Sequence, residues 1–375
     1  MNAEKKKKKL YSGDFWITFC IIALTGIGVI MVFSASIYQS GAIYNDQYTI
    51  FQKQFGYALA GLFVMFAASM IPYKIYQRYA TILLVISFVS LVLVFVPGIG
   101  HYSNGAYRWI KIFGFTLQTS EIAKIAVIIY MAASLTKIKD QVRSFKVGFL
   151  PYLLLMGAFS GIIAKQPNLS TAIIIAGLIL AMLFAAGGNL FHLIGLLVGI
   201  GMTAVYQILF TWRRDRWDDF LSAESNAMGT GWQPRQSILA LGSGGVFGQG
   251  LGNGKQKMFF LPEPQNDFIF AHIGEELGLI GTLVILILFL ILIWRGIKVS
   301  MDAPDTFSSL LAFGLVVLVG LQVIINVAVV TKLIPVTGIS LPFISAGGSS
   351  VVFLMGGMGI LLNISKHITP KRSRL

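Results

Sequence analysis

Long runs of apolar residues dominate this sequence and limit what it can fold into. About twenty consecutive apolar residues cross a bilayer as an α-helix, and such runs recur along the 375-residue chain with mostly short gaps between them. Because 56% of the residues are hydrophobic and only 12% are charged, a water-soluble domain could not hide this much apolar surface. The sequence therefore predicts an all-α integral membrane protein.

Ten apolar segments have the length of a crossing, and they predict a single polytopic domain covering residues 1–375. Most connections are short, but residues 98–119 and 212–267 form long ones that are rich in polar side chains. Long connections in compact proteins are usually functional or disordered. The expected crossings are residues 16–36, 55–71, 79–97, 120–136, 147–164, 170–187, 190–211, 268–294, 307–330 and 343–364.

The basic residues orient these crossings. An even number of crossings puts both ends of the chain on one side, which collects most of the Lys and Arg residues, including those of the basic segments 1–15 and 365–375. Because cytoplasmic loops are enriched in Lys and Arg, both termini are predicted to be cytoplasmic. Residues 212–267, between the seventh and eighth helices, then form a large loop outside a bacterial cytoplasmic membrane.

The formal charge of +14 does not indicate nucleic-acid binding, because the basic residues are scattered over many loops rather than interleaved with aromatics on one surface. Anionic lipid is the expected counterpart. The one cysteine, Cys20, excludes a disulfide within the chain. The four histidines show no metal-ligand spacing, so the sequence predicts no metal site built on them.

Asp267 follows a proline-bounded segment, residues 261–266, directly before the eighth apolar run. An aspartate there can be the N-cap of the following helix and accept backbone N–H bonds. It can also be a general base at the membrane surface, where partial removal from water raises its pKa towards a useful value. Glu275 and Glu276 follow two turns later, and we expect them either to face a wet cavity or to occupy a helix-capping or interhelical site with Lys or Arg as partner.

Two further groups of polar residues leave structural and functional interpretations open. Glu121 and Lys124, three residues apart at the start of a helix, either neutralise each other inside the bundle or line a substrate cavity. Arg108, Trp109 and Lys111 form a basic-aromatic group that either anchors the chain to lipid headgroups or binds a diphosphate.

Glycine and serine are concentrated in two places. Residues 242–252 are glycine-rich but lack a preceding strand and a Gly-Lys-Ser/Thr ending, which argues against nucleotide binding, and we expect a folded lid or pocket there. Ser349 and Ser350 open the last apolar helix, where small residues permit close helix packing or contact with an anion.

Several motifs, in their order and spacing, resemble the SEDS family of shape, elongation, division and sporulation proteins, to which FtsW, RodA and SpoVE belong. The resemblance covers nearly the whole chain, and its wording is more like the division and sporulation branch. The motifs are Asn104 to Ile110, Ser120 to Lys124, Gln166 to Ala172, Gln236 and Ser237 with the glycine-rich stretch, Leu261 to Glu276, and Pro342 to Ser350.

The resemblance implies a peptidoglycan glycosyltransferase that polymerises lipid II into β-1,4-linked glycan on the outer face of the membrane and releases undecaprenyl diphosphate. The essential catalytic aspartate of the family falls, by motif, on Asp267. A class B penicillin-binding protein usually supplies transpeptidation, and divisome or elongasome membrane proteins are the expected wider partners. The candidate substrate-binding residues are Arg108, Trp109, Lys111, Glu121, Lys124, Gln236, Ser237, Glu263, Ser349 and Ser350.

As a hypothesis, Asp267 takes the proton from the acceptor 4-hydroxyl while that oxygen displaces the donor's diphosphate, a single inversion that needs no second carboxylate. Arg108, Lys111 or a divalent cation, Mg²⁺ or Mn²⁺, would supply positive charge to the leaving group, although the sequence shows no dedicated metal cage. The alternatives are a lipid II flippase or other transporter, and a non-catalytic scaffold for a penicillin-binding protein.

Overall fold

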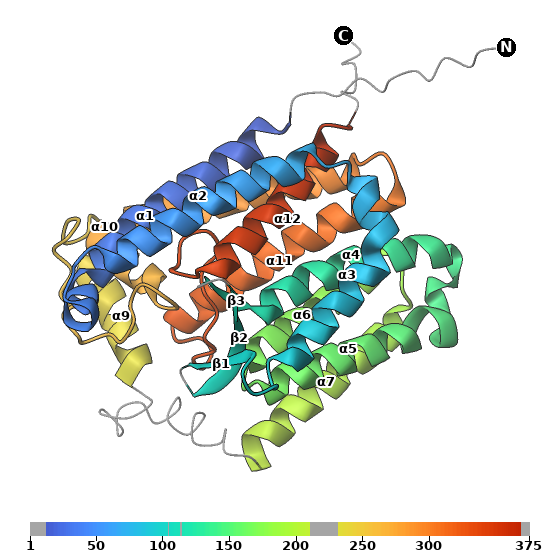
Figure 1. The fold of residues 1–375 in the computed structure, drawn as a ribbon, viewed down its shortest axis with the longest axis horizontal. Helices are drawn as coiled ribbons and strands as arrows, with labels where there is room; N and C mark the ends of the chain where they lie inside the picture. The colour runs from blue at the N-terminus through green and yellow to red at the C-terminus, as the bar shows by residue number, and fades with distance from the viewer. Residues whose placement is uncertain (1–12, 104, 113–114, 211–231, 369–375) are drawn as a thin grey trace, which may run out of the picture.

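The computed structural model describes residues 13–368 apart from 104, 113–114 and 211–231. Each of the ten segments expected from the sequence coincides with a helix, although several ends differ (Figure 1). The helices are α1 (Phe15–Tyr44), α2 (Thr49–Met70), α3 (Tyr73–Leu93), α4 (Thr119–Ile138), α5 (Leu150–Lys165), α6 (Leu169–Ala185), α7 (Leu190–Phe210), α10 (Ile269–Met301), α11 (Thr306–Val330) and α12 (Ser349–Ser365).

The last helix shows how a boundary predicted from apolarity alone goes wrong. The expected segment 343–364 begins as a helix only at Ser349, because residues before it form turns and Gly348, at the N-cap, has a φ of 53°. Between α4 and α5 the chain also forms a 3₁₀ turn, η1 (Lys139–Arg143), and a π turn, η2 (Phe145–Phe149).

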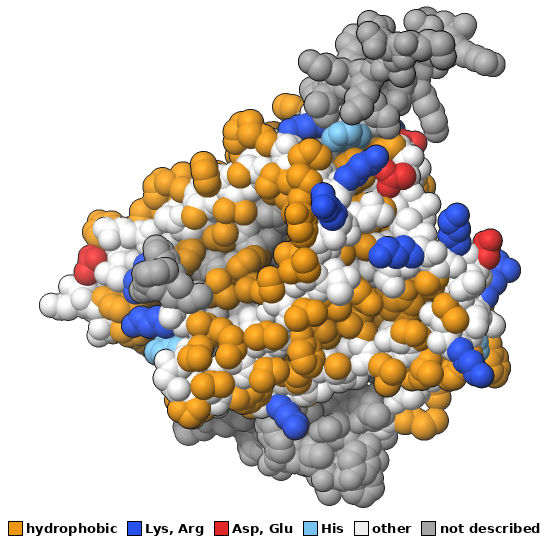
Figure 2. Space-filling model, turned by 45° about the vertical axis from the view of Figure 1, so that its right-hand side comes forward, with side chains coloured by type: hydrophobic (Ala, Val, Ile, Leu, Met, Phe, Trp, Pro, Cys, Tyr) orange, Lys and Arg blue, Asp and Glu red, His pale blue; other side chains and the backbone are white. Residues whose placement is uncertain are grey.

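Apolar helices with exposed apolar faces make this a multi-pass membrane protein. Among the described helices, α1, α2, α3, α10, α11 and the stretch Phe145–Lys165 are long and apolar enough to cross a membrane singly, whereas α6, α12 and residues 190–199 are apolar but shorter. Large side chains such as Phe63 and Phe184 are more than half exposed, as lipid contact requires. Figure 2 shows one such face, covered mainly by apolar side chains.

The two described ends of the chain lie together, as an even number of crossings requires. The N–H of Asp14, just before α1, donates to the hydroxyl of Ser365 at the end of α12 (3.1 Å). The Asp14 carboxylate also pairs with Arg295 in the last turns of α10. Because α10 runs away from this end towards its own first residue, Ile269, that first residue lies on the opposite side of the membrane from both chain ends.

The centre of the molecule is held by close helix contacts at small residues. α12 packs along α2 and also contacts α4 and α11 (Figure 1). A Cβ added at Gly359 would lie 2.2 Å from the carbonyl oxygen of Met65, and one at Gly61 would lie 2.5 Å from the sulfur of Met355. Such contacts are typical of helices that associate inside lipid.

The connection 98–119 contains a small antiparallel sheet that the sequence did not predict. Its strands are β1 (Gly100–Ser103), β2 (Ala106–Ile112) and β3 (Phe115–Gln118), paired in the order β1-β2-β3. An Asn-Gly pair at 104–105 is a hairpin signal, and Gly105 has the positive φ of 76° that such turns favour. The last strand of the sheet ends at Gln118 and α4 begins at Thr119, so the sheet fixes the position of the first turn of that helix.

The predicted loop 212–267 is partly helical. Residues Trp232–Gly244 form α9, which packs against α10 and α11, whereas residues 211–231 lie outside the described residues. The sequence did not predict α9, because its glycines and proline have low helix propensity. Packing against α10 and α11 stabilises the helix in the folded protein. The rest of the segment, 245–267, is built from turns.

α10 is broken at Gly278, whose φ of 68° and ψ of −164° interrupt the helical hydrogen-bond ladder. The glycine-rich stretch replaces the partners that are lost there. Four backbone bonds join the two segments: Leu279 N to Gly245 O (2.9 Å), Ile280 N to Val246 O (3.2 Å), Gln249 N to Glu275 O (2.9 Å) and Gly250 N to Glu276 O (3.0 Å).

Glycine is needed where this stretch meets the helix backbone. Gly248 has a φ of 80°, and a Cβ added to it would lie 2.2 Å from the carbonyl oxygen of Glu276. At Gly244 a Cβ would lie 1.9 Å from the carbonyl oxygen of Gly274. The folded segment expected at 242–252 is therefore an insert in the kink of α10, and it fixes the direction of the helix turns that precede the kink.

Candidate active site

Asp267 lies two residues before α10, and tertiary contacts fix its backbone. The N-cap of α10 is Phe268, which makes no side-chain capping bond, so the interpretation of Asp267 as the N-cap is wrong. The carbonyl of Asp267 accepts from the side-chain amide of Asn326 on α11 (2.8 Å). The same amide donates to the carbonyl of Ile339 (2.7 Å), so one buried residue joins the two segments.

The segment 338–346 lies beside Asp267 and the residues before it. A Cβ added at Gly338 would lie 3.5 Å from Oδ2 of Asp267, so this carboxylate oxygen faces the bare backbone of a glycine. The N–H of Ala346 donates to the carbonyl of Gln265 (2.9 Å). The motif at the start of α12 therefore meets the motif before α10, which are about eighty residues apart in the chain.

The surroundings of Asp267 adjust its basicity. The side chain is half-buried, and removal of the carboxylate from water raises its pKa to about 6. The negative charge of Glu263, which is exposed and accepts from the Asn266 amide (2.8 Å), adds to the rise, and the guanidinium of Arg108 opposes it. A carboxylate with this pKa is ionised at neutral pH and is a stronger base than an aspartate in water.

Arg108 reaches the site from a bulge in β2. The strand pairing between β1 and β2 skips Arg108, and bulges of this kind re-aim a side chain. Its guanidinium donates to the carbonyls of Gln166 (2.9 Å) and Pro167 (2.5 Å), between α5 and α6. Its charge also acts on Asp267. Three motifs that are distant in the sequence therefore meet around one carboxylate.

Trp109 and Lys111 follow Arg108 on the same strand, but their surroundings differ. Trp109 is half-buried and pairs with Gln118, whereas Lys111 is exposed and pairs with Thr116. Among the described residues, the charges that act on Asp267 are those of Glu263 and Arg108. The basic-aromatic group of the sequence is thus spread along β2, and Arg108 is the member whose charge lowers the pKa of Asp267.

Glu121 and Lys124 form a buried ion pair in the first turns of α4, with Nζ 2.8 Å from Oε1. This contact confirms that the two side chains neutralise each other inside the bundle. Glu121 also lines a small cavity about the size of one water molecule, so a role in lining a substrate cavity stays a prediction. Ser350, Ser340 and Gln322 line the same cavity. The Gln322 Oε1 atom is buried with no hydrogen-bond partner among the described residues, so it can accept from a water there.

The remaining predicted residues connect elements around the site. The hydroxyl of Ser349 accepts from the N–H of Gln118, which joins α12 to β3 (3.1 Å). The hydroxyl of Ser237 donates to the carbonyl of Val330 and joins α9 to α11 (2.7 Å). Gln236 is buried beside it. With its proton used in this way, Ser237 could meet a substrate only through its lone pairs.

A family model described as "Cell cycle protein", FTSW_RODA_SPOVE, matches residues 15–369. The chain belongs to the FtsW/RodA/SpoVE family. A relative from Geobacter metallireducens, a probable peptidoglycan glycosyltransferase FtsW, is 43% identical over 98% of both chains. The stage V sporulation protein E of Bacillus subtilis is 40% identical over 96% of this chain and 98% of its own.

Solved structures of the FtsW/RodA/SpoVE family share the fold. RodA of Thermus thermophilus aligns with a TM-score of 0.71 at 24% identity, over 96% of this chain and 98% of its own. A chain from a peptidoglycan synthase complex that coordinates polymerization and crosslinking aligns with a TM-score of 0.78 at 23% identity, over 96% of this chain and 99% of its own.

Two residues complete the site of this FtsW/RodA/SpoVE protein although the sequence did not single them out. Asn326 is an amide within the apolar run of α11, and a polar group at that depth is costly unless it is bonded, which is the signal that could have marked it. Gly338 carries no such signal. Its closeness to Asp267 depends on how the segment after α11 folds back.

Proposed function

We propose that this protein is a peptidoglycan glycosyltransferase that polymerises lipid II on the outer face of the cytoplasmic membrane. The observation that carries the proposal is Asp267. The motif resemblance implies that this residue is the family's catalytic aspartate. Its pKa is raised to about 6, and it lies at the opposite end of α10 from the two chain ends. The names of the relatives, which include probable peptidoglycan glycosyltransferases, support the same reaction.

In the proposed reaction Asp267 accepts the proton of the 4-hydroxyl of the acceptor N-acetylglucosamine. The oxygen forms a bond to the anomeric carbon of the donor N-acetylmuramic acid as the bond to the diphosphate breaks. The α-linked donor becomes a β-1,4 linkage in one inversion, and undecaprenyl diphosphate leaves with the bonding electrons. The raised pKa of Asp267 suits this task because a general base works best when its pKa is near the working pH.

The leaving diphosphate needs positive charge, and Arg108 is the first candidate because it already lies beside the base. Exposed Lys111 is a second. A divalent cation, Mg²⁺ or Mn²⁺, bound to the substrate's phosphates is a third candidate. Loss of polymerisation in EDTA and its recovery with Mg²⁺ or Mn²⁺ would identify such an ion.

We also propose a class B penicillin-binding protein as the partner that crosslinks the product, within the divisome or elongasome. A structurally similar chain belongs to a complex that coordinates polymerization and crosslinking, which supports this choice. We propose further that both termini are cytoplasmic. The described ends of the chain lie together, and the segments 1–15 and 365–375 are basic, which supports this orientation.

Purified protein with its penicillin-binding partner, in detergent and with lipid II, tests the proposal. The native chain and Asp140→Asn, an exposed aspartate in η1, are expected to make polymer, and Asp267→Asn is expected to lose at least roughly 100-fold in rate. Equal polymer from native protein and Asp267→Asn would exclude the catalytic role and favour a scaffold. No polymer from the native chain, with lipid II transfer across vesicles instead, would favour a flippase.

A further inference from the structure

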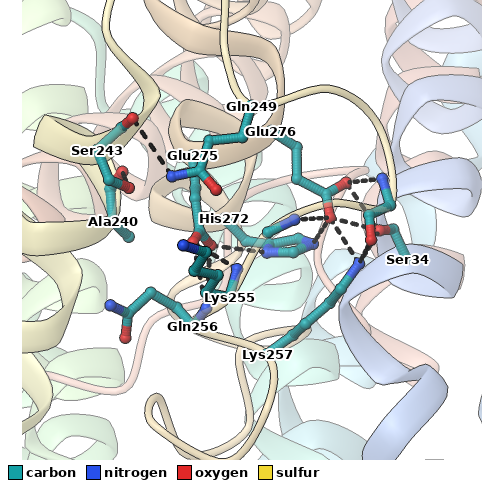
Figure 3. Close-up of polar contacts among 12 residues, drawn as sticks. Ser34, Ala240, Ser243, Gln249, Lys255, Gln256, Lys257, His272, Glu275 and Glu276 are labelled. Atoms are coloured by element: carbon teal, nitrogen blue, oxygen red, sulfur yellow. Dashed lines mark hydrogen bonds and ion pairs between the residues drawn. The ribbon is translucent and has the colours of Figure 1, made fainter.

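A buried cluster of titratable side chains lies on the turns of α10 that precede the kink (Figure 3). Glu275, Glu276 and His272 are each at most 1% exposed. Buried charges are costly unless they are paired and hydrogen-bonded. The proposed reaction uses none of the three, so their burial needs another explanation.

Glu276 collects an unusually complete set of donors. Lys257, itself only 4% exposed, places Nζ 2.8 Å from the Glu276 carboxylate. The N–H groups of Gly252 (3.0 Å) and Gly254 (3.3 Å) donate to the same carboxylate, and the hydroxyl of Ser34 on α1 donates at 2.7 to 2.8 Å. Figure 3 shows these groups converging from two segments on one side chain.

Glu275 binds the next residues of the same segment. Its carboxylate accepts from the N–H groups of Lys255 (2.7 Å) and Gln256 (3.1 Å). The ring of His272 lies between the two carboxylates, with Nε2 3.3 Å from Glu276 and Nδ1 3.8 Å from Glu275. The backbone from 252 to 256 is therefore fixed to the first turns of α10 by two side chains of that helix.

The attachment of residues 252–257 to α10 also restrains Asp267, because a short segment of the chain joins Lys257 to Asp267. Lys257 begins a segment that ends at Asp267, and both ends of the segment are held on α10, one through Glu276 and the other because Ile269 follows two residues later. Within the segment the Leu261 N–H donates to the Gln256 carbonyl (2.9 Å). The segment 257–267 is thus held at its first residue by the Lys257–Glu276 ion pair and at its last residue by the start of α10.

We propose that Glu276 and Lys257 are a pair of positioning residues that hold the segment 257–267 on α10 and so fix the carboxylate of Asp267 relative to its substrate. This inference rests on the proposed function. The hydrogen bonds of the two side chains go to each other, to Ser34 and to the backbone of residues 252 and 254, and among the described residues none goes to Asp267. When one partner is neutralised, the other is left charged in a buried site, and the segment must open to bring water to it.

The variants Glu276→Gln, Lys257→Met and the double variant test the pair by polymerisation kinetics. Gln keeps an oxygen for the N–H groups of Gly252 and Gly254, and Met keeps most of the apolar length of Lys. A displacement of about 1 Å in a catalytic group can cost roughly 100-fold in rate. We expect each single variant to lower kcat by about that factor with KM nearly unchanged, and the double variant to recover at least roughly tenfold, because no unpaired charge remains.

Asp14→Asn is the control, since it breaks another ion pair of α10, the half-buried one with Arg295 at the opposite end of the helix. It is expected to leave kcat per folded protein unchanged. The proposal is overturned if the single variants behave like Asp14→Asn, or if the double variant is no faster than the singles.

Hydrogen exchange of the backbone amides provides a readout that does not depend on activity. Glu276→Gln is expected to speed exchange in residues 257–267 by at least roughly tenfold, whereas Asp14→Asn is expected not to change it. Unchanged exchange in Glu276→Gln would overturn the positioning pair even if polymerisation proceeds. Faster exchange in Glu276→Gln, together with no polymer from the native chain, would retain the positioning pair and reject the proposed function.

Discussion

Asp267 has a pKa of about 6 in the folded protein, against 3.8 for an ordinary aspartate. The folded state therefore binds more protons than the unfolded state between these two values. The contribution of Asp267 to stability is therefore fully present below about pH 3.8 and is lost as the pH rises through about 6, so at neutral pH the ionised carboxylate lowers stability. Burial makes this residue a better base and at the same time a less stable part of the fold.

Replacement of Asp267 by asparagine should therefore stabilise the protein while it abolishes activity. At pH 7.5 the free energy of unfolding of Asp267→Asn is expected to exceed that of the native chain by on the order of 2 kcal/mol. The variant should therefore unfold at a higher temperature. The difference should disappear near pH 4, where the native carboxyl is protonated. Thermal unfolding in detergent at both pH values measures it, with Asp140→Asn as control, and a lower unfolding temperature for Asp267→Asn at pH 7.5 would contradict the account.

At the scale of elements, the kink of α10 and its glycine-rich insert orient the helix turns that lead to the site. The insert is stable only because the broken helix and the stretch 245–250 exchange four backbone hydrogen bonds. This exchange needs a backbone without side chains at the points of contact. Neighbouring glycines in the same stretch should therefore differ widely in their tolerance to substitution.

Gly248→Ala and Gly242→Ala form a matched pair for this idea. At Gly248 the added methyl would lie 2.2 Å from a carbonyl oxygen and the φ is positive, so we expect a loss of several kcal/mol in stability and of most activity. At Gly242 nothing lies within 4 Å and the residue is in α9, so alanine should be neutral or slightly stabilising. Unfolding temperature and polymerisation rate measure both, and equal effects would show that the insert is not packed as described.

At the scale of the whole molecule, the sequence predicted what depends on local patterns. The apolar runs located the ten helices, and the order of motifs located Asp267. The sheet escaped prediction because β1 and β3 are only four residues long. The contacts that build the site also escaped it, because Asn326 meets Asp267 across 59 residues and no local pattern encodes such a meeting.

Cysteine labelling tests the orientation of the whole molecule. The native Cys20 is buried, so the background reaction should be low. Lys111→Cys on β2 and Asp140→Cys in η1 are both exposed positions. In spheroplasts, whose cytoplasmic membrane is sealed, a membrane-impermeant thiol reagent is expected to label Lys111→Cys and not Asp140→Cys. The reverse pattern would place the chain ends outside.

The pH dependence of kcat/KM for polymerisation, measured on the native chain and on Glu263→Gln, tests the central claim most directly. The native activity is expected to fall on the acidic side with an apparent pKa near 6, because Asp267 must be ionised to accept the proton. Glu263→Gln removes a negative charge that raises the pKa of Asp267, so the acidic limb of its profile should move to lower pH, whatever its maximal rate. An acidic limb near 4 in the native chain, or one that Glu263→Gln leaves in place, would contradict the assignment of Asp267 as the general base.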